Sequence, residues 1–130
     1  MDDGFVVQVH SGYGPLHYDL MIQRGSVLAT WQLAIPPAEA TAQRPITARR
    51  IGDHRLAYLG YQGPVSGNRG SVAIADRGTC QLVSVEPSQW LVRLDGRTLR
   101  GPYCLRQTSQ EADQWTFAPA ALESGPGEGK

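Results

Sequence analysis

The chain has 130 residues, a formal net charge of zero and two cysteines. This length suits a single domain with one modest core, and the balanced charge excludes a protein that binds nucleic acid through a strong overall positive field. No run approaches the roughly 20 apolar residues of a membrane span, and no basic-then-apolar leader is present. We therefore expect a cytoplasmic protein without a membrane partner. Cys80 and Cys104 lack any CxxC spacing and are expected to be buried thiols, with a disulfide between them as the alternative.

Short runs of alternating apolar residues, separated by turn residues, follow one another along the chain. They predict strands at residues 5–9, 17–23, 27–33, 71–75, 81–85, 90–94 and 103–106, and a closing strand around Trp115. Glycine-containing turns are predicted at 11–15, 24–26, 76–78, 95–97 and 100–102. The only helical segment expected is one or two turns at 37–43. Many short strands with frequent turns indicate an all-β sandwich or barrel.

One β domain is expected over residues 1–118. The last residues, 119–130, include the sequence Ser-Gly-Pro-Gly-Glu-Gly and have nothing apolar to bury. We expect them to form a disordered tail.

The three histidines carry the main functional signal. His10 and His17 flank the turn at 11–15, Asp19 follows two positions later, and His54 comes in the sequence Asp-His-Arg-Leu-Ala-Tyr. Because side chains alternate along a strand, His17 and Asp19 share one face, and His10 lies across the hairpin from His17. Cross-strand Cβ atoms are about 5 Å apart. Two imidazoles and a carboxylate are ligands that divalent transition metals prefer, so this pattern predicts a metal site.

Longer motifs, in order along the chain, resemble one known family. They are Phe-Val-Val-Gln before His10, Leu-His-Tyr-Asp-Leu at 16–20, Val-Leu-Ala-Thr-Trp at 27–31, Asp-His at 53–54 with Leu56 and Tyr58, Gln-Gly-Pro-Val at 62–65, Asp-Arg-Gly-Thr at 76–79, and Val-Arg-Leu-Asp-Gly at 92–96 with Leu99, Gly101, Tyr103 and Leu105. Over about residues 4–118 the chain resembles the 3′-phosphoesterase domain of bacterial DNA ligase D, which also occurs as a stand-alone protein.

The resemblance implies a small closed or partly closed β-barrel of short antiparallel strands. It also implies a hydrolase that uses Mn²⁺, or another divalent transition metal, to remove 3′-phosphates and trim 3′-ribonucleotides from DNA ends in repair. By matching position, His10, His17 and Asp19 would hold the metal. The implied partners are DNA 3′ ends or primer–templates, together with a DNA ligase or polymerase of end joining.

The same resemblance implies catalytic and phosphate-binding roles for His54 and Tyr58. Packing or hydrogen bonding within the protein is the alternative for this pair. Arg44 and Arg69 are further candidates for the phosphate-binding shell, and Arg49, Arg50 and Arg55 are other arginines that could compensate for its missing contacts. Asp53 is a candidate either to fix the tautomer of His54 or to cap a turn.

The sequence departs from the family pattern in the phosphate-binding shell. The arginine usually found two residues after the metal-binding aspartate is Met21 here, and no lysine follows Trp31 within residues 32–37. Gly52 replaces the acidic residue before Asp-His, and Ile46 stands where an arginine is expected. Losing one electrostatic contact of this kind typically costs about 10²–10³-fold in rate.

Two other functions are compatible with these residues. One is a weakened or inactive module of the same fold that binds nucleic-acid ends. The other is a non-haem iron oxygenase, because His17, Asp19 and a later histidine also fit a facial triad. The chain is short for such an enzyme and no residue evidently anchors a keto-acid. The tryptophans are expected to fill the barrel, with stacking on bases as the alternative.

Overall fold

The computed structural model describes residues 3–121, which form strands and two short 3₁₀ segments. The elements in chain order are β1 (Asp3–Ser11), β2 (His17–Arg24), β3 (Val27–Leu33), η1 (Pro37–Glu39), β4 (Ile46–Arg55), η2 (Leu56–Gly60), β5 (Gly63–Pro64), β6 (Ser71–Glu86), β7 (Gln89–Asp95), β8 (Arg100–Gln107) and β9 (Gln114–Pro119). None of these helical segments has the length and apolarity to span a bilayer.

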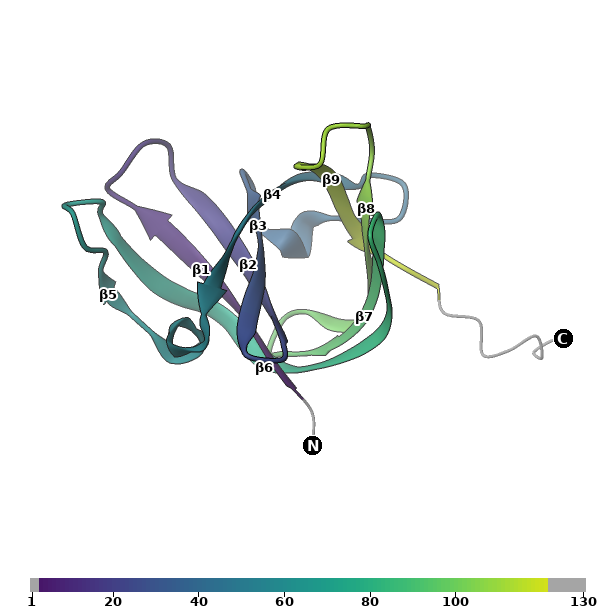
Figure 1. Ribbon diagram of the computed structural model, residues 1–130, viewed down its shortest axis with the longest axis horizontal. Coiled ribbons are helices and arrows are strands. Elements are labelled where there is room, and N and C mark those ends of the chain that lie inside the picture. The colour runs from purple at the N-terminus through teal and green to yellow at the C-terminus, as the bar shows by residue number, and fades with distance from the viewer. Residues whose placement is uncertain (1–2, 122–130) are drawn as a thin grey trace, which may run out of the picture.

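The strands form a closed antiparallel barrel. Eight of them pair in the order β1-β2-β3-β4-β9-β8-β7-β6, the pairing of β6 with β1 closes the ring, and β5 adds an extra strand beside β6. Figure 1 shows β6 running along the lower part of the molecule, where it joins the side that holds β1 and β5 to the side that holds β7 and β8. The all-β barrel expected from the sequence is confirmed. The segment η2 was not expected, whereas η1 lies inside the range 37–43 predicted to be helical.

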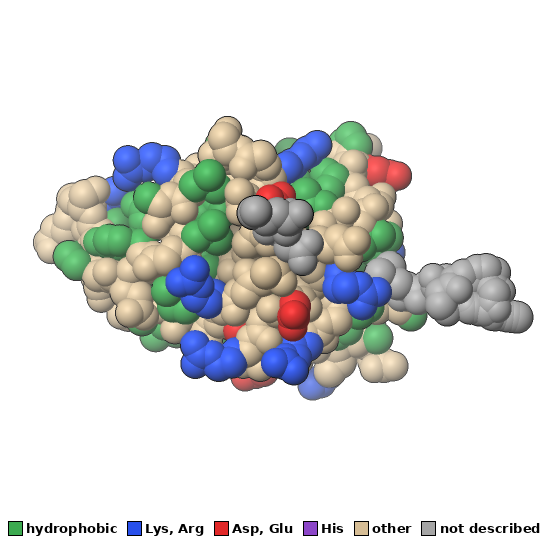
Figure 2. All heavy atoms as spheres, turned by 90° about the horizontal axis from the view of Figure 1, so that it is seen from below, with side chains coloured by type: hydrophobic (Ala, Val, Ile, Leu, Met, Phe, Trp, Pro, Cys, Tyr) green, Lys and Arg blue, Asp and Glu red, His purple; other side chains and the backbone are tan. Residues whose placement is uncertain are grey.

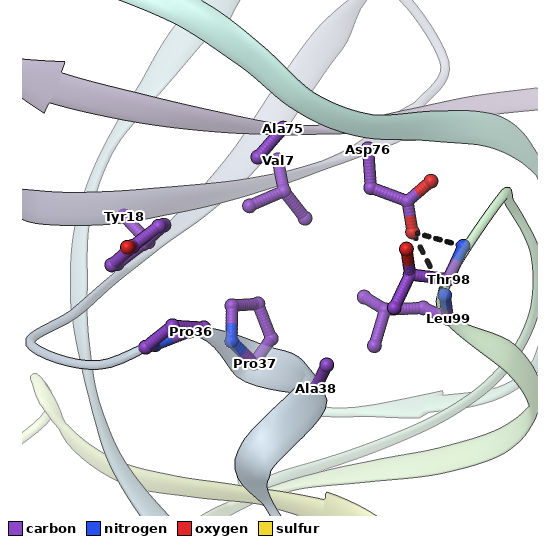
Figure 3. Close-up of a pocket in the computed structure, with 9 residues that line it drawn as sticks. All are labelled: Val7, Tyr18, Pro36, Pro37, Ala38, Ala75, Asp76, Thr98 and Leu99. Atoms are coloured by element: carbon purple, nitrogen blue, oxygen red, sulfur yellow. Dashed lines mark hydrogen bonds between the residues drawn. The ribbon is translucent and has the colours of Figure 1, made fainter.

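Strand β6 corrects one part of the sequence interpretation. The turn predicted at 76–78 is wrong, because β6 continues through these residues. Instead, the Asp76 carboxylate accepts hydrogen bonds from the backbone N–H groups of Arg97, Thr98 and Leu99, in the loop between β7 and β8. Figure 3 shows two of these bonds at the edge of an apolar cavity of about 150 Å³. The aspartate thus orders a turn elsewhere in the chain, not its own.

Strand β4 was not predicted from the sequence. Its inward positions include Ile46 and Ala48, which are buried in the core, but the alternation then brings Arg50 to the inside. The Arg50 guanidinium carbon lies 4.5 Å from the ring centroid of Trp31, and it also stacks near Trp90 and Trp115 at 5.3 and 5.5 Å. An arginine on an inward position conceals the apolar alternation by which strands are recognised.

The barrel interior holds the main core. The indole rings of Trp31, Trp90 and Trp115 pack edge to face, with centroid separations of 5.1 and 5.7 Å, and all three residues are buried. The expectation that the tryptophans fill the barrel is confirmed. Cys80 is buried in the same core, and Cys104 is half-buried on β8, where burial raises the pKa of its thiol.

A second apolar cluster lies on the opposite face of β1, β2 and β3. Val6, Met21 and Leu28 form its buried centre, and Leu56 and Leu59 of η2 pack over them. Gln8 fastens η2 in place: its side-chain Nε2 donates to the backbone oxygens of Tyr58 and Tyr61 at 3.1 and 3.0 Å. This outer face, covered at one end by η2, positions the polar residues described below.

At the C-terminal side, β9 includes the predicted closing strand around Trp115 and ends at Pro119. The backbone N–H of Ala120 donates to Pro102 in β8. Residues 122–130, the greater part of the predicted tail, lie outside the described residues.

Candidate metal and phosphate site

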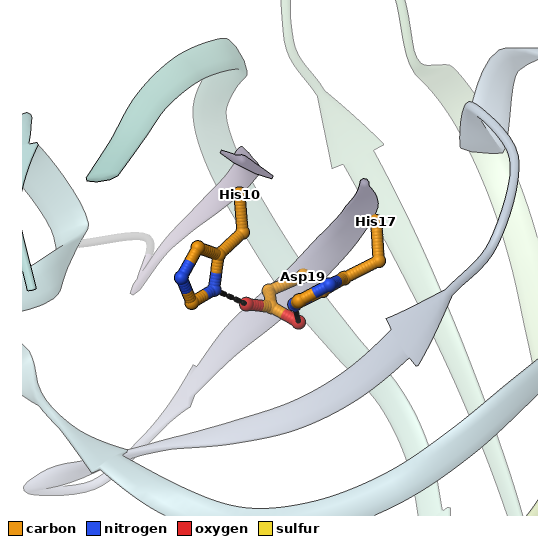
Figure 4. A group of neighbouring side chains, drawn as sticks. All are labelled: His10, His17 and Asp19. Atoms are coloured by element: carbon orange, nitrogen blue, oxygen red, sulfur yellow. Dashed lines mark ion pairs between the residues drawn. The ribbon is translucent and has the colours of Figure 1, made fainter. Parts of the chain in front are cut away.

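Four polar side chains occupy neighbouring positions on the outer face of β1 and β2. Gln8 is opposite Asp19 and His10 is opposite His17 in the antiparallel register. Cross-strand partners point to the same face of a sheet, so both histidines and the aspartate project together, as the sequence pattern predicted. Figure 4 shows the two imidazoles extending from the ends of β1 and β2 toward the Asp19 carboxylate.

The three side chains converge closely enough to hold one ion. His10 Nδ1 lies 3.9 Å from Asp19 Oδ2, and His17 Nε2 lies 3.6 Å from Asp19 Oδ1. One ligand atom from each residue falls within 4.8 Å of the other two. Metal–ligand bonds to nitrogen and oxygen are about 2.0–2.2 Å, so small side-chain rotations suffice to bring all three atoms onto a common ion.

The outer nitrogens of both imidazoles meet backbone carbonyl oxygens. His10 Nε2 lies 2.7 Å from the oxygen of Arg69, and His17 Nδ1 lies 3.1 Å from the oxygen of Pro15. A carbonyl only accepts, so these ring nitrogens must carry the proton and donate. In the neutral ring, the nitrogen facing Asp19 then presents a lone pair. This arrangement is typical of metal-binding histidines.

Asp19 is almost fully buried, with 5% of its surface exposed. Its Oδ1 accepts no hydrogen bond from any described residue. Burial raises the pKa of the Asp19 carboxyl. The charge of Arg49, and those of His17, His54 and His10 when these rings are protonated, act against that rise. A buried acceptor to which no described residue donates, faced by the lone pairs of two neutral imidazoles, fits a divalent cation.

His54 comes from the end of β4 and lies beside this group. Its Nδ1 is 3.1 Å from the oxygen of Gly52 and 3.0 Å from the hydroxyl of Thr30, which itself donates to Leu28. Both partners accept from the same Nδ1–H, so Nε2 is left for a ligand. Gly52 and Thr30, and not Asp53, therefore set the orientation of this ring.

Tyr58 is carried by η2 next to His54. The two rings are 5.4 Å apart and nearly perpendicular. Tyr58 also packs against Tyr61 at 5.5 Å, and the two tyrosines line a cavity of about 320 Å³ with Arg55 and Ser66. The structure thus brings His54 and Tyr58 together at the rim of the outer face.

The two predicted phosphate-binding arginines lie at different places. The backbone oxygen of Arg69 holds His10, while its guanidinium donates back to Ser66 of the same loop at 2.7 Å. Arg44 is exposed in a turn closed by hydrogen bonds with Thr41, before the start of β4. The face drawn in Figure 2 displays basic side chains separated by neutral and apolar ones, with no single continuous basic patch.

Arg49 lies next to the candidate metal ligands His10, His17 and Asp19. Its Nη2 donates to Gln32 Oε1 at 2.7 Å, and both residues line a cavity of about 350 Å³ together with His17. From the sequence alone, Arg49 was one of several arginines that could compensate for the missing phosphate contacts. Its place on the outer face became evident once the register of β4 against β3 was known.

Comparison with known proteins gives one consistent result. The family described as "DNA Ligase D 3'-phosphoesterase domain" matches residues 8–107. The "Multifunctional non-homologous end joining protein LigD" of Mycobacterium bovis is 29% identical over 118 residues, which is 85% of this chain and 15% of the relative. The protein of that name from Mycolicibacterium smegmatis is 29% identical over 121 residues, or 82% of this chain and 16% of the relative. The chain therefore spans about 15% of the length of the curated relatives it matches.

Proposed function

Because this chain belongs to the DNA ligase D 3′-phosphoesterase domain family, we propose that it is a metal-dependent phosphoesterase that processes 3′-phosphate and 3′-ribonucleotide ends of DNA during repair. The reaction is hydrolysis. Water forms a new bond to phosphorus, the bond between phosphorus and the leaving oxygen breaks, and that oxygen takes up a proton.

One observation carries this proposal: two imidazole nitrogens converge on a buried carboxylate oxygen that has no hydrogen-bond donor among the described residues. His10, His17 and Asp19 would hold the ion, with Mn²⁺ or a similar divalent transition metal as the proposed occupant. When bound, such an ion supplies polarisation of a phosphoryl oxygen and a lowered pKa of water.

The other residues of the site are assigned to the phosphate. His54 keeps Nε2 available while Thr30 and Gly52 hold Nδ1–H. When the ring is also protonated at Nε2, it can donate to a phosphoryl oxygen or pass a proton to the leaving oxygen. The Tyr58 hydroxyl is proposed as a second donor. The phosphate-binding roles predicted for Arg44 and Arg69 remain predictions.

The proposed partners are DNA 3′ ends, in primer–template form, and a ligase or polymerase that uses the resulting 3′-hydroxyl. This partner class is supported by the curated relatives, whose names describe end-joining proteins. We propose that the protein carries out this role in the cytoplasm.

The test is turnover of a labelled primer–template that ends in a 3′-phosphate or a single 3′-ribonucleotide. We expect conversion to a 3′-hydroxyl end in Mn²⁺ and none in excess EDTA. His17→Ala and Asp19→Asn should abolish turnover, and His54→Ala should lower it about 100-fold. Asp53→Asn is the matched control, because Asp53 adjoins His54 in the chain but is exposed, and it should retain full activity.

A second candidate is supported by Met21. This position is 1% exposed and belongs to an apolar cluster, so it contributes no positive charge where the family usually has an arginine. A module that binds 3′ ends without cleaving them is the alternative. Tight, metal-dependent binding of the same primer–template, with no product after prolonged incubation, would favour this alternative and contradict the hydrolase proposal.

A further inference from the structure

We infer that Arg49 is the cationic contact for the 3′-terminal phosphoryl group of the substrate, and that the cavity shared by Arg49 and His17 receives this group. The inference rests on the proposed function. It assigns to Arg49 the positive charge toward the phosphate that Met21 does not supply.

The strand register places Arg49 in the same cross-sheet row as Asp19. Asp19 is opposite Gln32 in the pairing of β2 with β3, and Gln32 is opposite Arg49 in the pairing of β3 with β4. Adjacent strands are about 4.8 Å apart, so the backbones of Asp19 and Arg49 are separated by about 10 Å. An extended arginine side chain covers a large part of that distance. Met21 belongs to the next row, opposite Thr30.

The side chain of Arg49 is held in place and still has donors to offer. The bond from Nη2 to Gln32 Oε1, at 2.7 Å, fixes one edge of the guanidinium. A guanidinium has five N–H donors in a rigid fork that matches a phosphoryl group. The donors not used by Gln32 therefore remain for an anion.

The cavity has the character expected of a terminal-nucleotide site. Its volume is about 350 Å³, and its lining combines His17 and Arg49 with the polar side chains of Gln32 and Thr47. Pro15 and Leu16 add an apolar wall, and Leu16 is 52% exposed. A phosphoryl group beside Arg49 would lie next to the imidazole of His17 while its sugar contacts this wall.

The neighbouring arginines do not have this geometry. Arg50 points to the other side of β4, over the ring of Trp31. Arg55 lines the separate cavity of Tyr58 and Tyr61, and the guanidinium of Arg69 is bonded to Ser66. Among the described residues, Arg49 is the arginine that lines a cavity together with His17, one of the candidate metal ligands. Its positive charge also acts to lower the pKa of Asp19, against the effect of burial.

The experiment compares affinities for two 5′-fluorescein-labelled primer–templates that differ only in ending with a 3′-phosphate or a 3′-hydroxyl. Fluorescence anisotropy is measured in EDTA and in Mn²⁺, and a denaturing gel checks that the probe is intact. We expect the wild-type protein to prefer the 3′-phosphate by about 10-fold. Arg49→Gln should reduce this preference to about 2-fold or less, and Arg49→Lys should restore part of it.

Arg93→Gln is the matched control, because it removes the same charge from an exposed position of β7, a strand that pairs with β6 and β8, and it should keep the full preference. Arg49→Gln should also retain its affinity for Mn²⁺ alone. The inference would be overturned by an undiminished 3′-phosphate preference in Arg49→Gln, by an equal loss in Arg93→Gln, or by a loss of Mn²⁺ binding in Arg49→Gln, which would make Arg49 a support of the metal site. If Arg49→Gln turned over the 3′-phosphate at the wild-type rate, the inference would be wrong while the proposed function stood.

Discussion

At the scale of single residues, the main feature of the site is the free-energy cost of burying the charged Asp19 carboxylate. Both imidazoles are held by carbonyl oxygens on their outer side, so their lone pairs face a carboxylate whose Oδ1 has no donor among the described residues. Lone pairs that face one another without a proton or cation between them are repulsive. The arrangement is therefore unfavourable until a proton or a cation enters, and a metal ion bound here would raise the stability of the fold.

The first prediction follows from this cost. Asp19→Asn should raise the melting temperature of the protein in EDTA at pH 8 by about 3 °C, because a buried charge is removed and an amide can donate to an imidazole lone pair. In Mn²⁺ the order should reverse. A hundredfold excess of ion over its Kd stabilises the wild type by about 2.7 kcal/mol, and the variant gains nothing.

Thermal unfolding followed by circular dichroism measures both effects. Asp95→Asn serves as the control, since Asp95 is an exposed aspartate on β7, and it should behave as the wild type in both buffers. A lower melting temperature for Asp19→Asn in EDTA would contradict this account of the metal-free site.

At the scale of elements, the segment η2 depends on one buried side chain. Gln8 is 1% exposed and donates to two backbone oxygens, those of Tyr58 and Tyr61. The segment η2 is short, and short isolated helical segments are marginal in water. Its position over the outer face, and with it the placement of Tyr58, therefore relies on these contacts and on the apolar packing beneath.

Gln8→Ala should accordingly destabilise the protein by about 1–3 kcal/mol and expose η2. Limited proteolysis with chymotrypsin, read by mass spectrometry, should show faster cleavage after Tyr58 or Tyr61. Gln81→Ala, at an exposed position of β6, is the matched control and should be cleaved as slowly as the wild type. Equal cleavage rates for all three proteins would show that Gln8 does not hold the segment.

Strand β2 illustrates what the sequence could and could not predict about the site. The alternation of His17, Asp19 and Met21 correctly placed them on one face, because successive side chains of a strand point to opposite faces of the sheet. It did not predict that η2 would cover that face at Met21 and leave it open at His17. Such coverage depends on a contact between residues about 50 positions apart, Gln8 and Tyr58, which local patterns do not contain.

Met21→Arg tests this coverage directly. Arginine is the residue that the family usually has at this position. It should not add a phosphate contact here, because its guanidinium would enter the cluster of Val6 and Leu28 under η2. We expect a loss of about 3 kcal/mol or more in the free energy of unfolding by urea. Met21→Leu keeps the cluster apolar and should cost less than about 1.5 kcal/mol. A stable Met21→Arg protein with higher phosphatase activity would contradict this view of the second cluster.

At the scale of the whole molecule, β6 closes the barrel and shows why turn signals were misleading. Gly78 is opposite Phe5 of β1, and a Cβ there would collide with the carbonyl oxygen of Asp95. The glycine therefore permits close approach of two strands and does not form a turn. Similarly, Arg50 in β4 hides a strand by placing a cation against Trp31 in the interior. In both cases the residue type is explained by a distant partner.

Gly78→Ala should therefore destabilise the barrel by about 3 kcal/mol or more, because the backbone atoms of Asp95 and Gly96 must move. Gly52→Ala is a matched control: its added methyl meets nothing within 4 Å, so we expect a change within about 0.5 kcal/mol. Urea unfolding monitored by tryptophan fluorescence measures both variants. Equal stabilities would disprove the close approach of β6 and β7 at this point.

The binding of Mn²⁺ to the metal-free protein tests the central claim most directly. Electron paramagnetic resonance of free Mn²⁺, titrated with protein, should reveal one bound ion per chain in the wild type and none in His10→Ala, His17→Ala or Asp19→Asn. His54→Ala should bind the ion like the wild type, because His54 is assigned to the phosphate. A wild-type chain that takes up no Mn²⁺, or variants that bind it equally well, would contradict the account.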